Sequence, residues 1–168
     1  MKPQDILVVL MLLSIRKDEW TQAQIADSLM ISKAEMSQIF ARLRTCGFLD
    51  LSKTHLQKLA IREFLIHGLK YVFPAKPGTK VRGIATAFSA PPIQKHITGN
   101  GDIYVWKSAK GNRRGIEIKP LYKTVPKIVN HLPGLYELLV ITDTLRIGKV
   151  REVEIAISEL DKILSNVG

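Results

Sequence analysis

Apolar and polar residues follow three different patterns along the chain. Residues 1–70 have helical periodicity and almost no proline or glycine, and a first helix over residues 4–16 is apolar on nearly all sides. Residues 71–132 contain six of the eight prolines. Residues 134–164 return to helical periodicity, in two segments that separate near Gly148. These patterns predict a protein of the α+β class.

Two strands are predicted in the middle of the chain. The stretches "IYVW" (103–106) and "RGIEIKPLY" (114–122) are typical of strands, and "KSAKGNR" between them contains turn-forming residues. We therefore expect a β-hairpin with a basic tip. Tyr104 and Trp106 lie on one face of the first strand, where they either pack in the core or stack on bases of RNA or single strands.

Residues 21–45 predict two short helices joined by a tight turn at Met30 and Ile31. Thr21 is a good N-cap for the first helix. Ser32 caps the second helix, and Glu35 three residues later completes a capping box. Two helices in this arrangement allow the first to brace the second across DNA. Their predicted apolar faces consist of Ile25, Ala26 and Leu29, and of Met36, Ile39, Phe40 and Leu43.

A very short wing is predicted after the second helix. The stretch "GFLDLSKTHLQ" (47–57) leaves the helix, turns and comes back. A long helix, "KLAIREFLIHGLKYVF" (58–73), follows it. The residues of this helix that we expect to face inward are Leu59, Ile61, Phe64, Leu65 and Leu69.

This part of the chain resembles the winged helix-turn-helix of bacterial MarR-like regulators. The resemblance covers residues 3–70 and implies a DNA-binding domain over 1–70, whose second helix enters the major groove. The family often has glycine in the turn, where this chain has Met30, and left-handed geometry costs a residue other than glycine about 1 kcal/mol. The matching residues are Gln22, Ala26, Leu29, Ile31, Ser32, Met36, Ile39 and Leu43.

The rest of the chain is similar to a poorly characterised family of small bacterial winged-helix proteins. Stretches such as "TAFSAPP" and "IEIKPLYKTVP" carry that likeness. Members of the family are labelled regulators from the helix-turn-helix alone, so the likeness implies little mechanism beyond it. It favours a second unit over residues 71–168, with a basic β-containing segment and a pair of C-terminal helices.

The polar face of the second helix is small near its N-terminal end, as a helix in the major groove requires. Gln38 can pair with an adenine edge, and Arg42 with guanine or phosphate. The alternative is the solvated face of a protein–protein module. The predicted DNA-binding residues are Thr21, Gln22, Ser32, Lys33, Ala34, Ser37, Gln38, Arg42, Arg44 and, in the wing, Lys53, with Lys110, Arg113 and Arg114 at the hairpin tip.

The distribution of charge points to an anionic partner. The chain has a formal net charge of +10, and residues 71–132 carry 11 Lys and Arg against 2 Asp and Glu. A basic field of this kind attracts polyanions such as nucleic acid, although it can also serve solubility alone. The apolar run "ILVVLMLL" (6–13) is far shorter than the roughly 20 residues of a membrane span, so we expect a buried helix.

A palindromic operator has two half-sites, and each chain supplies one reading helix, so two chains are needed. The C-terminal helices are predicted to form the interface of this homodimer. The alternative is that these helices only cover the protein's own sheet. Two apolar stripes would form the interface: Leu135, Leu138, Leu139 and Leu145 on the first helix, and Val153, Ile157, Leu160 and Leu164 on the second.

No enzyme signature stands out, and we expect neither a cofactor nor a metal site. The weakest alternative is a Mg²⁺-dependent nuclease that uses Asp102 and Glu117 as ligands beside Lys119. The single cysteine, Cys46, is expected to be a buried, inert thiol, and it suits a reducing cytoplasm.

Together these patterns predict a cytoplasmic, sequence-specific double-stranded DNA-binding protein that represses transcription by covering an operator. The alternative from another class is an RNA-binding or toxin-partner interaction module. The residue pattern names no operator and no small-molecule or protein effector.

Overall fold

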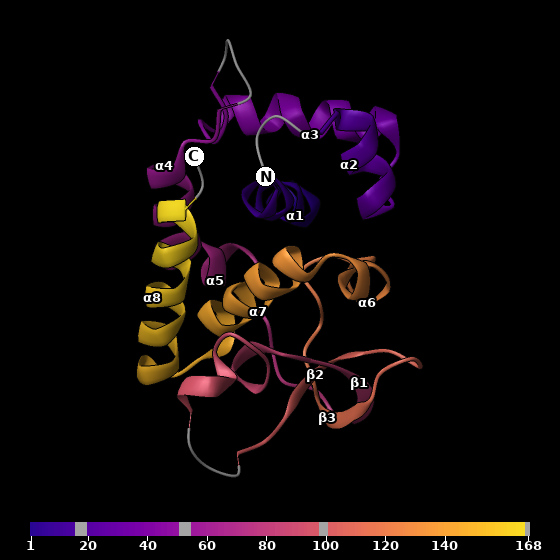
Figure 1. Cartoon of the computed structure of the whole chain (residues 1–168), viewed down its shortest axis with the longest axis vertical. Helices are drawn as coiled ribbons and strands as arrows, with labels where there is room; N and C mark the ends of the chain where they lie inside the picture. Colours follow the sequence, from indigo (N-terminus) through magenta and orange to yellow (C-terminus); the bar gives the residue numbers. More distant parts are fainter. Residues whose placement is uncertain (16–19, 51–54, 98–100, 167–168) are drawn as a thin grey trace.

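The computed structural model of the chain is an α+β protein and describes residues 1–15, 20–50, 55–97 and 101–166. Its elements form layers along the long axis of the molecule (Figure 1). At one end lies α3 (Lys33–Thr45), with α1 (Pro3–Ser14) beneath it and α7 (Pro133–Ile147) beneath α1. A small β-barrel occupies the other end.

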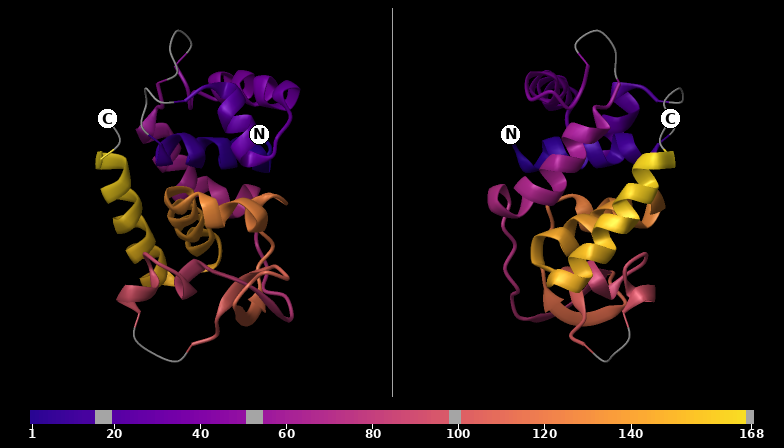
Figure 2. Two further views of the ribbon diagram at one scale, coloured as in Figure 1. Left: turned by 45° about the vertical axis from the view of Figure 1, so that its right-hand side comes forward. Right: turned by 90° about the vertical axis from the view of Figure 1, so that its left-hand side faces the viewer.

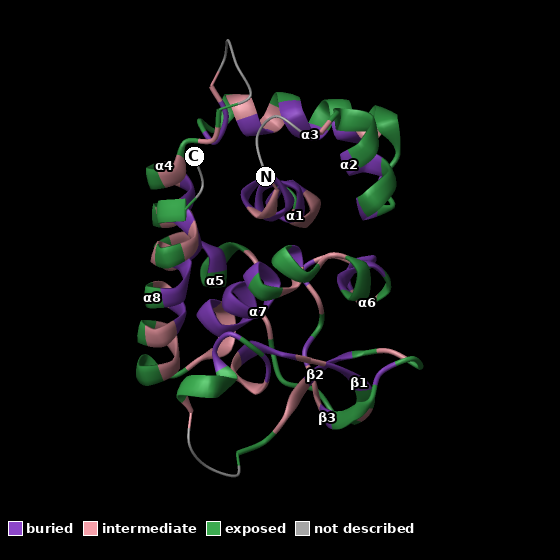
Figure 3. Ribbon diagram, in the orientation of Figure 1, coloured by how far each residue is buried: buried purple, intermediate pink, exposed green. Residues whose placement is uncertain are grey.

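Helices α1 and α7 form the centre of the core. The apolar sequence around residues 4–16 predicted this position for α1. Every residue of α1 from Asp5 to Leu13 is buried, and so is every residue of α7 from Leu138 to Leu145 (Figure 3). One hydrophobic cluster includes residues of α1, α3, α7 and the barrel. The segments on both sides of the predicted boundary at residue 70 therefore share a core.

The two C-terminal helices form where the sequence predicted them, but the apolar stripe of α7 is covered within the chain. Leu135, Leu138, Leu139 and Leu145 of α7 are each at most 4% exposed. Helix α8 (Val150–Asn166) buries Leu160 and Leu164, and it runs beside α4 (Figures 1 and 2). The stripe of α7 is therefore not free to form a dimer interface, whereas Val153 and Ile157 of the α8 stripe are only half-buried.

An ion pair fastens α8 to α4 (Lys58–Glu63). The Arg62 Nε donates to Asp161 at 2.6 Å, and the Lys58 Nζ donates to the carbonyl of Leu164 at 3.2 Å. The Arg62 guanidinium holds the pKa of the Asp161 carboxyl below its ordinary value. These contacts join segments about a hundred residues apart in the chain.

Capping defines the ends of α2 (Gln22–Leu29) and α3. The Thr21 hydroxyl accepts from the Gln24 amide at 3.2 Å, and the Gln24 side chain accepts from the Thr21 amide at 2.7 Å. The Ser32 hydroxyl accepts from the Glu35 amide at 3.2 Å, as predicted. The Glu35 carboxylate bonds to Arg42 instead of returning to Ser32, so only half of the predicted capping box forms.

The turn between α2 and α3 places Met30 in the left-handed region, with φ 55° and ψ 44°. Its amide and that of Ile31 donate to the carbonyl of Ala26, which closes the C-terminus of α2. The turn therefore keeps the geometry that favours glycine, and the chain tolerates the steric cost of a methionine.

Replacing Met30 by glycine should raise the free energy of unfolding by about 0.5 kcal/mol, because roughly 1–2 kcal/mol of steric cost disappears while glycine adds about 0.5–1 kcal/mol of backbone entropy. Urea denaturation measures the difference. Ala34→Gly is the matched control: Ala34 lies exposed inside α3, where glycine should lower stability by about 1 kcal/mol. A Met30→Gly protein less stable than the parent would contradict this account of the turn.

The segment after α3 returns on itself, in agreement with the predicted wing. Leu49 and Leu56 form an antiparallel bridge, and the Asp50 amide donates to the carbonyl of His55 at 3.0 Å. Residues 51–54 at the tip, including the predicted DNA contact Lys53, lie outside the described residues.

A continuous helical stretch follows, as predicted, with a π-helical centre. Helix α4 continues through a π-helix at Phe64–Gly68 into α5 (Leu69–Val72). Ile61, Leu65 and Leu69 are buried, as expected. Leu59 is 79% exposed, against the prediction. It lies two residues before the buried Ile61 and therefore on the opposite side of the helix.

The barrel corrects the predicted β-hairpin. Strands β2 (Tyr104–Lys107) and β3 (Arg113–Glu117) each pair antiparallel with β1 (Lys80–Thr86), which the sequence reading missed. β2 pairs with the second half of β1, and β3 pairs with the first half. Because both are antiparallel to β1, β2 and β3 run parallel to each other. The barrel is closed, and β3 ends at Glu117, not at residue 122.

Glycines allow the three strands to close so tightly. A Cβ at Gly83 would collide with the Trp106 carbonyl oxygen, and one at Gly115 with that of Ile103. A Cβ at Gly111 would collide with the backbone of Gly83. Only a residue without a side chain fits these contacts.

Short helices connect the larger elements. Their bounds are Ala87–Ser89 (η2), Gln94–His96 (η3), Val125–Ile128 (α6) and Val129–His131 (η4). Among the described helices, none has the length and apolar content that crossing a membrane requires.

A buried polar cluster joins α7 to the barrel. Asp143 is 1% exposed and accepts from the Trp106 indole at 2.7 Å and from the Thr86 hydroxyl at 2.9 Å. The Arg146 Nη1 donates to it at 2.8 Å, and the Arg146 Nε donates to the carbonyl of Phe73 at 2.8 Å. Burial raises the pKa of Asp143, while Arg146 and the two hydrogen bonds oppose that rise. The cluster connects three parts of the chain.

Candidate nucleic-acid interface

The outer face of α3 is exposed at one end of the molecule (Figure 3). Its apolar face is buried as predicted, with Met36, Ile39 and Leu43 at most 1% exposed. The exposed residues on the outer face are Ser32, Lys33, Ala34, Ser37, Gln38 and Ala41. A face of short side chains around one glutamine lets a helix backbone approach another surface closely.

Thr21 and Gln22 lie exposed at the start of α2, which packs against α3. Arg44 is half-buried, with its guanidinium carbon 5.9 Å from the centre of the Phe40 ring. Cys46 is exposed just after α3, so the expectation of a buried thiol is wrong. Its position at the helix C-cap leaves its side chain outside the apolar face.

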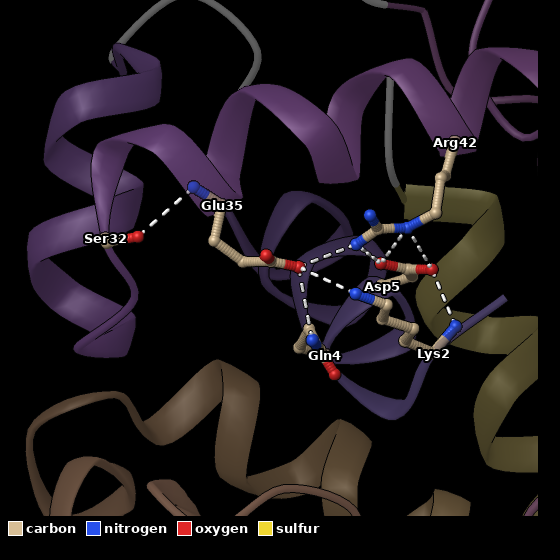
Figure 4. A network of polar contacts seen from close by, with 6 residues as sticks. All are labelled: Lys2, Gln4, Asp5, Ser32, Glu35 and Arg42. Carbon is tan, nitrogen blue, oxygen red and sulfur yellow. Dashed lines mark hydrogen bonds and ion pairs between the residues drawn. The ribbon is translucent and has the colours of Figure 1, made fainter.

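Arg42 does not lie on the exposed face, where the sequence placed it. Its side chain is 27% exposed and turns towards α1 (Figure 4). The Nε donates to both carboxylate oxygens of Asp5, at 3.0 and 3.1 Å, and the Nη2 donates to Asp5 at 2.7 Å and to Glu35 at 2.9 Å. The prediction of an exposed, base-reading Arg42 therefore fails on its geometry, because a buried carboxylate on α1 takes its donors.

The same network orders the start of α1. The Asp5 side chain, 1% exposed, also accepts from the Lys2 amide at 2.7 Å. Gln4 donates to Glu35 at 3.2 Å. The hydrogen bonds that Arg42 donates to Asp5 raise the pKa of Arg42, and the one that it donates to Glu35 lowers the pKa of Glu35. The network joins α1 to α3 and keeps both acids occupied beneath the exposed face.

The basic residues of the barrel form a second surface. Lys110, Arg113 and Arg114, the predicted hairpin tip, are exposed on it. Figures 1 and 2 place the barrel at the end of the molecule opposite to α3. The predicted DNA contacts of the hairpin tip therefore do not lie beside those of α3.

Sequence reasoning missed Lys80 and Arg82 on this surface, both of them exposed. The alternation in "TKVRG" was the available signal, because Lys80 and Arg82 are two residues apart and so share one face of a strand. The prolines and glycines around this stretch had hidden the strand.

The predicted nuclease residues do not gather into a site. Asp102 is exposed in the loop before β2, where it lines a hollow with Lys80 and Arg114. Glu117 ends β3 and does not line that hollow, and Lys119 is exposed beyond it. Within the described ranges, no group of three or more His, Cys, Asp or Glu side chains could hold a metal ion.

The aromatic residues of β2 belong to the core, which supports packing over base stacking. Trp106 is 1% exposed, with its ring centre 5.8 Å from that of Tyr136. Tyr104 is half-buried, edge-on to Phe88 at 4.9 Å between ring centres. The barrel thus presents basic side chains without these rings.

Comparison of the chain with protein-family models, with curated proteins and with solved structures finds no match in any of the three. The resemblance to winged-helix regulators therefore stays a prediction that rests on the residues of α2, the turn and α3.

Proposed function

We propose that the chain is a sequence-specific double-stranded DNA-binding protein that represses transcription by covering its operator. In this proposal α2, the turn and α3 are a helix-turn-helix, and residues 48–57 are its wing. The observation that carries it is the outer face of α3, whose exposed residues are small and polar while its other face is locked in the core. The mixed α+β fold is compatible with it.

The dimensions and chemistry of α3 suit the major groove. Its 13 residues span a length of about 20 Å. The diameter of a helix with its side chains, about 10–12 Å, fits a major groove about 12 Å wide. Gln38 presents an amide that can bond both polar atoms of an adenine edge. Ser32 and Lys33 lie at the helix start, where free amides and positive charge favour phosphate oxygens. With Arg42 committed to Asp5, Gln38 becomes the main candidate for reading bases.

The proposal includes a homodimer acting in the cytoplasm. A palindromic operator presents its half-sites about 34 Å apart, which a single α3 cannot reach. The stripe of α7 is covered, so that helix is not free to join the two chains, while Val153 and Ile157 of α8 stay half-buried. The single cysteine supports a reducing compartment.

Gln38→Ala tests this function. Genomic fragments are first selected on the wild-type protein, and the affinity of both proteins for a selected fragment is then measured by fluorescence anisotropy. We expect the variant to lose about 1–3 kcal/mol of binding free energy and to relax its preference at one base pair. Its melting temperature should not change, because Gln38 is exposed.

Gln94→Ala is the matched control, since Gln94 is equally exposed but lies in η3, away from α3. It should bind the selected fragment as the parent does. If selection recovers no shared sequence, or if Gln38→Ala binds the fragment with unchanged affinity, α3 does not read DNA.

A further inference from the structure

The side chains on the barrel surface include two arginines directly opposite each other. Arg82 on β1 pairs with Arg114 on the antiparallel strand β3, so both side chains project from the same face. Arg113 and Lys80 are their neighbours along the strands. Like charges in directly opposed positions destabilise a sheet, and a bound anion would remove that cost.

These arginines have no ion-pair partner among the described residues, although Asp102 lines a neighbouring hollow with Lys80 and Arg114. This contrasts with Arg42, Arg62 and Arg146, each of which pairs with an aspartate. The barrel arginines thus differ from these three arginines, because they have no ion-pair partner among the described residues.

These side chains surround one hollow. It has a volume of about 420 Å³ and is lined by Arg82, Asn112, Arg113 and Arg114. The planar guanidinium group matches phosphate oxygens with two parallel hydrogen bonds, and the Asn112 amide adds further donors. The lining contains no acid that would repel an anion.

The backbone beneath the hollow fixes the positions of the arginines. The Ser108 amide donates to the carbonyl of Arg82 at 3.1 Å, and the Gly111 amide donates to the carbonyl of Ser108 at 3.1 Å. Gly111 packs directly against Gly83, which leaves no room for a side chain between them. The connection from β2 to β3 is therefore held against β1, and the side chains of the three arginines extend from a backbone whose position is fixed.

We propose that this hollow binds the phosphate backbone of duplex nucleic acid, without regard to sequence, as a site separate from α3. Lys80, Lys107 and Lys110 lie exposed on the same barrel and extend the positive charge beyond a single phosphate. The large exposed apolar side chains of the described residues all lie outside the barrel, so it lacks the stacking rings of single-strand sites and the apolar centre of protein interfaces.

The site does not depend on the proposed function of α3, because the two surfaces lie at opposite ends of the molecule (Figure 1). A protein with both surfaces can hold two duplex segments at once. The barrel would then retain the protein on any DNA, while α3 selects the operator.

The test measures binding of the full chain to a 20-base-pair duplex of random sequence over a series of salt concentrations. The variant carries Arg82→Gln, Arg113→Gln and Arg114→Gln. We expect at least tenfold weaker binding and a slope of log affinity against log salt that is smaller by about 2–3, from about 0.9 per phosphate contact. The melting temperature should stay equal or rise, because the opposed charges are removed.

The charge-matched control replaces Lys123, Lys127 and Arg151, three exposed cations outside the barrel, by glutamine. It should keep most of the affinity and the slope. An equal loss of affinity in the control would show that the effect comes from net charge alone, and it would overturn the proposal. A larger loss for single-stranded RNA than for the duplex would also overturn it, in favour of a single-strand site.

Discussion

Asp143→Ala is expected to lower the free energy of unfolding by about 3–5 kcal/mol, because removing one partner of a buried ion pair leaves the other charge uncompensated. Arg146 would lose its carboxylate while its side chain remains 95% buried, at 5% exposure. The Trp106 indole would lose its acceptor in the core as well. Urea denaturation followed by tryptophan fluorescence, to which Trp106 and Trp20 both contribute, measures the loss.

Asp161→Ala is the matched control for this measurement. Asp161 also pairs with an arginine, at 2.6 Å, but its side chain is 44% exposed. Its loss should cost less than about 1 kcal/mol, since exposed ion pairs contribute little. Asp143→Asn keeps acceptors for Trp106 and Thr86 and should fall between the two. Equal effects of Asp143→Ala and Asp161→Ala would show that the cluster between α7 and the barrel does not hold the fold together.

Arg42→Ala is expected to lower the free energy of unfolding by about 3 kcal/mol, at the low end of the range for a broken buried pair. Asp5 would stay buried with only the Lys2 amide as a described donor. The partial exposure of Arg42, 27% of its side chain, keeps the expected cost at the low end. Thermal and urea unfolding both measure it.

The double variant Asp5→Ala with Arg42→Ala separates this cause from simple loss of packing. It should be more stable than Arg42→Ala alone, because no buried charge is left without a partner. Arg44→Ala serves as the neighbouring control and should cost about 1 kcal/mol or less, the scale of its contact with Phe40. If Arg42→Ala unfolds like the parent but binds selected DNA weakly, Arg42 reads DNA after all.

Both predictions concern aspartates that lie buried in apolar helices. Asp5 lies in the apolar helix α1 and Asp143 in the apolar helix α7. Each one accepts hydrogen bonds from an arginine and from at least one other donor, which satisfies the requirement for a buried charge. These two clusters fix the positions of α3 and of the barrel on the common core.

The sequence by itself determined the local elements of this protein. The Thr21 and Ser32 caps, the tight turn and the apolar faces of α2 and α3 depend on residues within one or two helical turns of each other. The basic surplus of residues 71–132 was also visible, since charge can be counted without a fold. For that reason the exposed face of α3 and the basic character of the middle segment could both be anticipated.

Only the tertiary structure decided which distant residues meet. Arg42 carried the right spacing for an exposed face, but its partner Asp5 lies 37 residues away, and no local pattern reports that distance. Likewise, β2 and β3 look like a hairpin until β1 supplies a partner to both, and that choice depends on glycines that let three backbones approach. Burial of a charge and closure of a sheet are set by contacts across the whole chain, whereas periodicity reports only the neighbours of each residue.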